Sequence, residues 1–121
     1  MNRIFVTGTG TDVGKTVISA ILVEALKADY WKPVQAGDLQ NTDTMRVKDL
    51  VSNNQSVFYP ESFRLTKSIS PHAAAAYDNF EIKESNIIPP RHTNTLIIEG
   101  AGGLMVPLNR NFLMIDLIQQ L

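Results

Sequence analysis

The residues with the clearest potential for chemistry lie near the N-terminus, where glycines at positions 8, 10 and 14 precede Lys15 and Thr16. Glycines let a backbone approach an anion closely, and the N–H groups of such a loop and of a following helix can surround phosphates. The Lys15 ammonium can then reach the β- and γ-phosphates, and the Thr16 hydroxyl can bind Mg²⁺. The strict phosphate-loop pattern has its first glycine at position 9, where this chain has Thr9. A glycine-rich turn with a chance Gly-Lys-Thr is the alternative, but the position between a strand and a helix favours a phosphate loop.

Three further ionisable residues lie where strands end or a helix begins. Glu99 ends an apolar run, and its carboxylate can accept Mg²⁺ directly or through water, or can be a solvated strand end. Asp43 closes the cluster 41–43, Asn-Thr-Asp, for which helix capping alone is a sufficient explanation. Lys32 ends another short strand, and most lysines are simply solvated. From the residues alone, both interpretations of each remain open.

Apolar spacing and helix breakers indicate the elements that must position these residues. Residues 15–27 contain no Gly or Pro and predict a helix, with Ile18, Ile21, Leu22 and Ala25 on one face that we expect to be core. The other expected elements are strands at 4–6, 30–32, 57–59, 95–98 and 104–108 and helices at 44–51, 70–77 and 114–121, with a polar loop at 35–42 and irregular chain at 53–69.

Strands that alternate with helices, with a phosphate loop at the first strand–helix turn, predict an α/β fold. The expected form is a doubly wound, mainly parallel sheet of the P-loop NTPase type. Ligands of such sheets bind at the carboxyl ends of the strands, where the loop 7–14, Lys32 and Glu99 are expected to meet. The length of 121 residues predicts a single domain, 1–121.

Composition narrows the classes of partner. The net charge of −1 and the lack of a basic block argue against nucleic acid or an anionic membrane. The chain has no cysteine, so a disulfide framework and a thiolate metal site are excluded. No apolar run approaches the roughly 20 residues of a membrane span. A cytoplasmic location fits these observations.

Taken together, the motifs resemble those of the dethiobiotin synthetases. The segment 8–16, Gly-Thr-Gly-Thr-Asp-Val-Gly-Lys-Thr, is similar to the variant phosphate loop of that family, which explains the early glycine. The other similar motifs are Lys-Pro-Val-Gln at 32–35, Asn-Thr-Asp at 41–43, Ser-Pro-His at 70–72, and Glu-Gly-Ala-Gly-Gly with Pro-Leu at 99–103 and 107–108. Because these motifs occur in the family's order across nearly the whole chain, the combination is specific.

The resemblance implies an ATP- and Mg²⁺-dependent ligase of biotin biosynthesis, which closes the ureido ring of dethiobiotin from 7,8-diaminononanoate and CO₂. A substrate amine would become a carbamate, the carbamate would attack the γ-phosphate, and the second amine would displace phosphate. By resemblance, the catalytic residues are Lys32, Lys15 and Thr11, and the magnesium ligands are Thr16, Asp43 and Glu99. The nucleotide-binding residues are Asp12, Val13, Gly14, Lys15, Thr16, Val17, Asp43, Glu99, Gly100, Ala101 and Gly102.

Two departures from the family pattern affect the expectations. The family often has a hydroxyl residue at the position of Ala36, so we expect only a backbone contact with the substrate there. Family members also continue past residue 121 and work as homodimers. We therefore expect a fold truncated at its C-terminus, with further chain or a second subunit covering its apolar faces.

Other P-loop classes remain as alternatives. A ParA/MinD-like partitioning ATPase would be a nucleotide-switched binding module, but such proteins carry a signature lysine at the place of Gly10. A nucleotide-binding domain like those of cobyrinic-acid amidases and a non-catalytic P-loop fragment are the other two.

Overall fold

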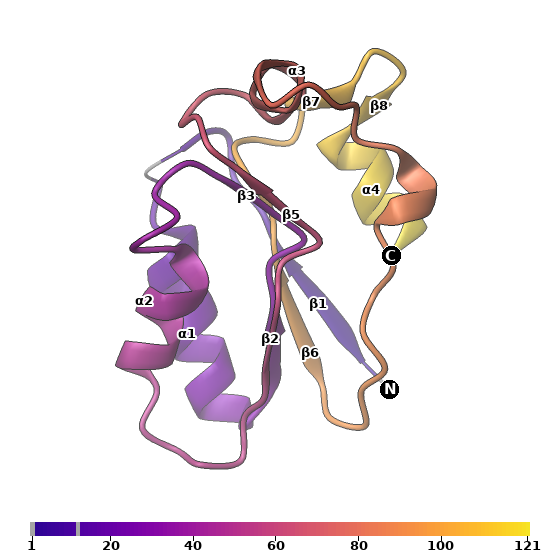
Figure 1. Ribbon diagram of the computed structural model, residues 1–121. Helices are drawn as coiled ribbons and strands as arrows, with labels where there is room; N and C mark the ends of the chain where they lie inside the picture. Colours follow the sequence, from indigo (N-terminus) through magenta and orange to yellow (C-terminus); the bar gives the residue numbers. More distant parts are fainter. Residues whose placement is uncertain (1, 12) are drawn as a thin grey trace.

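The computed structural model describes residues 2–11 and 13–121 and centres on a parallel sheet (Figure 1). Within this part of the chain, strands pair in the order β1 (Arg3–Val6), β6 (Leu96–Glu99), β2 (Asp29–Trp31) and β4 (Phe58–Tyr59). All of these pairings are parallel, and β6 lies between β1 and β2. The sheet confirms the predicted α/β fold class, and it brings the carboxyl ends of β1, β6 and β2 to one edge.

The extended chain continues past the ends of β2 and β4. β3 (Val34–Ala36) follows Pro33, β5 (Phe63–Leu65) follows Pro60, and the two pair in parallel. The predictions of a polar loop at 35–42 and of irregular chain at 53–69 are wrong where these two strands lie. Proline removes one ladder donor but fits extended chain, so it interrupts the pairing here without turning the backbone away.

Helices cover both faces of the sheet (Figure 1). On one face lie α1 (Lys15–Leu26) and α2 (Asp43–Leu50), and on the other lies α4 (Met114–Gln120). The helix α3 (Pro71–Tyr77) and the hairpin of β7 (Pro107–Asn109) and β8 (Phe112–Leu113) lie beyond the carboxyl ends of the strands. A short 3-10 turn, η1 (Glu84–Asn86), lies on the α4 side. No helix in the described part of the chain has the length and apolar character needed to cross a membrane.

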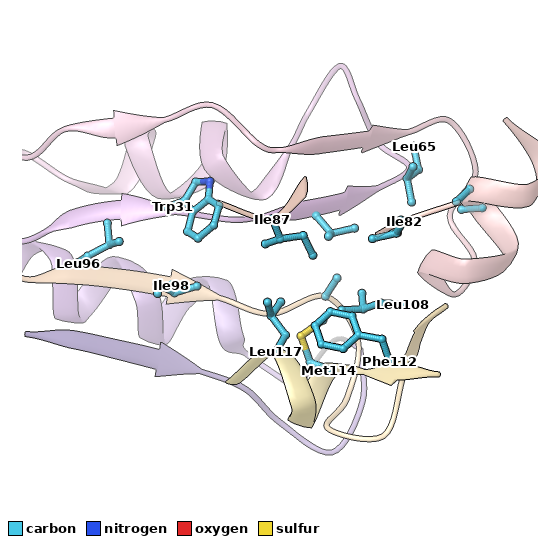
Figure 2. Close-up of a cluster of buried hydrophobic side chains, with 14 residues drawn as sticks. Trp31, Leu65, Ile82, Ile87, Leu96, Ile98, Leu108, Phe112, Met114 and Leu117 are labelled. Atoms are coloured by element: carbon cyan, nitrogen blue, oxygen red, sulfur yellow. The ribbon is translucent and has the colours of Figure 1, made fainter. Parts of the chain in front are cut away.

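Two apolar cores lie on opposite faces of the sheet, as the alternation of strand side chains requires. Tyr30 and Ile97 belong to the core under α1 and α2. Their chain neighbours Trp31 and Ile98 belong to the larger core on the α4 side, where Leu117 of α4 packs (Figure 2). Side chains that alternate with Trp31 and Ile98 therefore point toward α1 and α2, and this direction matters for the site.

The face of α1 that contacts the sheet differs from the predicted one. The exposed fractions of Ile18 and Ile21 are 50% and 56%, and Ala25 is exposed as well. Of the predicted face, only Leu22 packs against the core, and it is partly buried. The buried side chains of α1 are Ser19, Ala20 and Val23. Small side chains at 19 and 20 let the helix pack closely on the sheet, so close packing and not the largest apolar stripe sets its rotation.

The strand predicted at 104–108 lies later, as β7 (Pro107–Asn109), and it is not part of the main sheet. It pairs antiparallel with β8, which the sequence analysis did not predict. The predicted helices at 44–51, 70–77 and 114–121 correspond to α2, α3 and α4 and are confirmed to within a residue at each end.

Candidate active site

The phosphate loop connects β1 to α1, and it depends on glycine for one left-handed residue and for one close approach. Gly14 precedes α1 with φ of 99°, a left-handed conformation that glycine adopts without strain. Gly103, from the loop after β6, packs on the loop backbone so closely that a Cβ there would lie 2.7 Å from the Thr9 carbonyl oxygen. The Leu104 N–H also donates to the Gly8 carbonyl at 3.1 Å. The two glycine-rich segments therefore form one wall. Asp12, a predicted nucleotide contact, lies outside the described residues.

Lys15 and Thr16 begin α1 and face the cavity that this loop borders. The Lys15 ammonium donates to the Gly10 carbonyl at 2.6 Å, across the loop. The Thr16 hydroxyl donates to Oε2 of Glu99 at 3.2 Å. The first helical turn is thus linked both to its own loop and to the end of β6.

Glu99 is fully buried, and its carboxylate is held by donors from several elements. Tyr30 Oη donates to Oε1 at 3.0 Å, and Lys32 Nζ and the Thr16 hydroxyl donate to Oε2. Burial and the neighbouring Glu99 charge raise the pKa of Tyr30 well above its usual value. This phenol therefore stays a hydrogen-bond donor at every physiological pH.

Tyr30 is a site residue that was not predicted from the sequence. The available signal was strand alternation, because Tyr30 and Lys32 are two residues apart and so point to the same face.

Lys32 is buried, with an exposed fraction of 3%, so the interpretation of Lys32 as a solvated lysine at a strand end is wrong. Its ammonium lies 2.9 Å from Oδ2 of Asp43 and 3.1 Å from Oε2 of Glu99, and it donates to the Gly100 carbonyl at 3.0 Å. An ammonium has three N–H donors, so these acceptors use all of them.

Asp43 begins α2, but it does not cap that helix. The cap is Thr42, whose hydroxyl accepts from the Met45 N–H at 3.2 Å. The Asp43 N–H donates to the Gln35 side chain at 3.2 Å, which fixes the start of the helix beside β3. Burial alone would raise the pKa of Asp43, but the Lys32 ammonium opposes this and holds the pKa below its usual range. The Asp43 carboxylate is therefore ionised and turned toward Lys32.

These groups border a cavity of about 830 Å³, within the usual size range for small-molecule sites. Among the predicted site residues, the lining contains Thr11, Gly14, Lys15, Thr16, Val17, Lys32, Ala36, Asp43, Glu99, Ala101 and Gly102. Val13 and Gly100 are not part of the lining, although the Gly100 carbonyl contacts Lys32. Another part of the wall, 68–71, comes from the first residue of α3 and the chain before it. That wall contains two residues of the Ser-Pro-His motif, to which the sequence analysis assigned no role in the site.

The donor set suits magnesium. Mg²⁺ prefers hard oxygen ligands and is commonly held by one or two carboxylates together with water and phosphate oxygens. Thr16 and Asp43 both line the cavity with Glu99, and the Thr16 hydroxyl contacts that carboxylate directly. In the described residues, no cluster of three or more His, Cys, Asp or Glu side chains forms an alternative metal centre. The residues therefore fit a cation whose remaining ligands would be water or nucleotide oxygens.

A phosphate loop between the first strand and first helix of a parallel sheet defines the class of this protein, a P-loop nucleotide-binding α/β domain. A protein-family model described as an AAA domain matches residues 2–121, and the chain belongs to that family.

Curated relatives carry a more specific name. The chain is 57% identical over 116 residues to the ATP-dependent dethiobiotin synthetase BioD of Christiangramia forsetii, in a match that covers 96% of this chain and 56% of the relative. Its identity to the protein of the same name from Cytophaga hutchinsonii is 49%, covering 99% of this chain and 58% of that protein. For Paramagnetospirillum magneticum the identity is 45%, with coverage of 100% and 58%. The resemblance to dethiobiotin synthetases is confirmed, and the ParA/MinD-like alternative is not favoured. The chain spans little more than half the length of these relatives.

Proposed function

We propose that this protein acts as an ATP- and Mg²⁺-dependent ligase that closes the ureido ring of dethiobiotin from 7,8-diaminononanoate and CO₂. The observation that carries the proposal is the buried Lys32 ammonium, which lies among carboxylates in the same cavity as the phosphate loop. The name shared by the relatives supports the same reaction.

In this proposal the phosphate loop binds the ATP triphosphate. Loop residues and the start of α1 line the cavity, and the backbone N–H groups of such a loop and helix start favour anions. Lys15 supplies positive charge to the β- and γ-phosphates, and Thr11 on the same wall contacts the transferred group. The remaining nucleotide contacts come from Val17 and from Ala101 and Gly102, which also line the cavity.

Thr16, Asp43 and Glu99 would hold Mg²⁺ in this proposal. Bound there, the ion would supply charge neutralisation at the β- and γ-phosphate oxygens. The protein's part is orientation, because Tyr30 and Thr16 fix the Glu99 carboxylate and Gln35 fixes the helix start that carries Asp43.

Lys32 would act on the reacting atoms. Its ammonium stabilises negative charge on the substrate carbamate and on the γ-phosphate while that charge is redistributed in the transition state. Ala36 also lines the cavity and would offer the organic substrate only its backbone. The wall at 68–71 limits the space that remains for that substrate.

Three further features belong to the proposal. We treat 1–121 as one nucleotide-binding domain, and the two-faced sheet supports this. We also propose that the working enzyme is a homodimer, which the exposed apolar side chains Val17, Ile18 and Ile21 of α1 support. A cytoplasmic location is consistent with the lack of cysteine.

The test is direct. The protein is incubated with diaminononanoate, isotopically labelled bicarbonate and Mg-ATP, and dethiobiotin that carries the label is sought by mass spectrometry. Lys15→Gln should abolish product, whereas the matched charge change Lys48→Gln, at an exposed position of α2, should not. The proposal fails if ATP binds, as measured by calorimetry, but no labelled dethiobiotin forms.

A further inference from the structure

The contacts of Lys32 leave its ammonium with no donor for a substrate. Every N–H of the group is directed at Asp43, Glu99 or the Gly100 carbonyl, and the side chain is almost fully buried. A lysine that acts on a carbamate or a phosphate must give up at least one of these acceptors. In this state of the site, Lys32 therefore cannot donate a hydrogen bond to a substrate.

The acceptors that hold Lys32 are also the proposed metal ligands. Asp43 and Glu99 belong to both sets, and a monovalent ammonium and a divalent cation cannot both take the same carboxylate oxygens at contact distance. Glu99 has little freedom to turn away, because Tyr30 and Thr16 also hold its oxygens. Lysine has the longer and more flexible side chain, and Lys32 already lines the cavity.

We propose that Lys32 is the resident counter-cation of Asp43 and Glu99 in the nucleotide-free protein, and that uptake of a divalent cation displaces its ammonium into the cavity. The inference rests on the metal ligands of the proposed function. It adds a coupling between the two events: metal affinity is lowered by the resident lysine, and the lysine becomes available to substrate only after the metal binds.

The direction of the coupling follows from the cost of unpaired charge. Without Lys32, the buried Glu99 carboxylate would lose this ion pair, and Asp43 would keep, within the described part of the chain, only the longer contact from the half-exposed Arg46, 3.7 Å from Oδ1. Two carboxylates so poorly compensated are strongly unfavourable. A divalent cation would relieve that repulsion, so removal of Lys32 should raise metal affinity. A lysine that was only a substrate contact would have no such effect.

The first experiment measures Mn²⁺ binding by electron paramagnetic resonance, with Mn²⁺ as a probe that shares the oxygen preference of Mg²⁺. Wild type is compared with Lys32→Met in the absence of nucleotide. We expect the dissociation constant of Lys32→Met to be lower by at least about tenfold. Lys48→Met removes one charge from an exposed position of α2 and should bind Mn²⁺ like wild type. The gain should disappear in Lys32→Met/Asp43→Asn. Equal or weaker binding by Lys32→Met overturns the proposal.

The second experiment uses the wild-type protein and decides the question even if Lys32→Met does not fold. Lysines are acetylated briefly with acetic anhydride, and each site is quantified by peptide mass spectrometry with and without Mn²⁺. Acetylation of Lys32 should accelerate by about tenfold with Mn²⁺, because a buried, paired amine becomes accessible. Lys48 serves as the exposed reference and should not change. The proposal is overturned if Lys32 reacts at the same rate with and without Mn²⁺.

Both experiments omit nucleotide, diaminononanoate and bicarbonate. A lack of ligase activity would therefore leave their readouts intact and refute only the proposed reaction. Conversely, an active ligase whose Lys32→Met variant gains no Mn²⁺ affinity would refute only the competition.

Discussion

Tyr30→Phe isolates the contribution of one buried hydrogen bond to the site. The substitution removes only the hydroxyl, which donates to Oε1 of Glu99 at 3.0 Å, and keeps the ring that packs 6.1 Å from Phe58. Hydrogen bonds to charged groups contribute about 1.5–3 kcal/mol. Because Glu99 is fully buried, water cannot replace the lost donor. We therefore expect the free energy of unfolding to fall by about 2 kcal/mol.

The assay is urea unfolding at neutral pH, followed by the fluorescence of Trp31 on the neighbouring position of β2. The midpoint should fall while the urea dependence of the free energy stays unchanged, because the surface exposed on unfolding is nearly the same. Tyr77→Phe is the matched control, since Tyr77 is exposed and should tolerate the change within about 0.5 kcal/mol. If Tyr30→Phe were as stable as Tyr77→Phe, the Tyr30 hydroxyl would not be what holds the Glu99 carboxylate.

Three further sets of substitutions test separate parts of the structure. Lys32→Gln should lower dethiobiotin turnover on the order of 100- to 1000-fold with ATP affinity changed only a few-fold, whereas Lys15→Gln should weaken ATP binding as well. Calorimetry measures the ATP affinity of each variant, and mass spectrometry measures the product. Near-normal turnover of Lys32→Gln would refute the catalytic role of Lys32. Gly103→Ala should lower the free energy of unfolding, measured in urea, by about 1–3 kcal/mol, because the new Cβ would overlap the Thr9 carbonyl. Gly10→Ala is the control, since a Cβ at Gly10 meets nothing within 4 Å. If the two variants were equally stable, the close approach of Gly103 to the loop would be contradicted. Hydrogen bonds from Ser52 and Asn53 lower the pKa of Glu24 from 4.5 to about 2, so its stabilising effect is present above pH 4.5 and is lost as pH falls toward 2. Glu24→Gln should therefore be less stable than wild type at neutral pH, and thermal unfolding should show that difference shrinking between pH 4.5 and pH 2.

The sequence was sufficient for the phosphate loop and the carboxyl-end location of the site because both depend on local signals. Glycine spacing, a β-branched strand before the loop and a breaker-free helix after it are all properties of adjacent residues. The convergence of Lys32 and Glu99 was also predictable, since parallel strands end at a common edge. Their direct contact was not, because the pairing of β6 between β1 and β2 joins residues far apart in the chain.

The errors came from places where tertiary packing decides between local options. Helix α1 has two faces that could pack on the sheet. Apolar periodicity favoured the face with Ile18 and Ile21, but the face that packs on the sheet carries the smaller side chains of Ser19 and Ala20. The strands β3 and β5 are three residues each and follow prolines. Such short segments have too little periodicity to distinguish them from loops. Each is stabilised by pairing with the other, which is a non-local property.

Side chains of β2 alternate between the two faces of the sheet, and this explains why an apolar core lies on one face and the ionic cluster of the site on the other. Tyr30 and Lys32 point to the α1 side of the sheet, and so does Glu99 from β6, whereas Trp31 points into the opposite core. Shifting the register of β2 by one residue would turn the indole to the face where the phenol and the ammonium now lie, and it would leave the buried Glu99 without the Tyr30 and Lys32 donors. The packing of Trp31 therefore fixes the register of the strand, and through it the distances between Lys32, Glu99 and the phosphate loop. In this way the apolar core on one face of the sheet determines the electrostatics on the other.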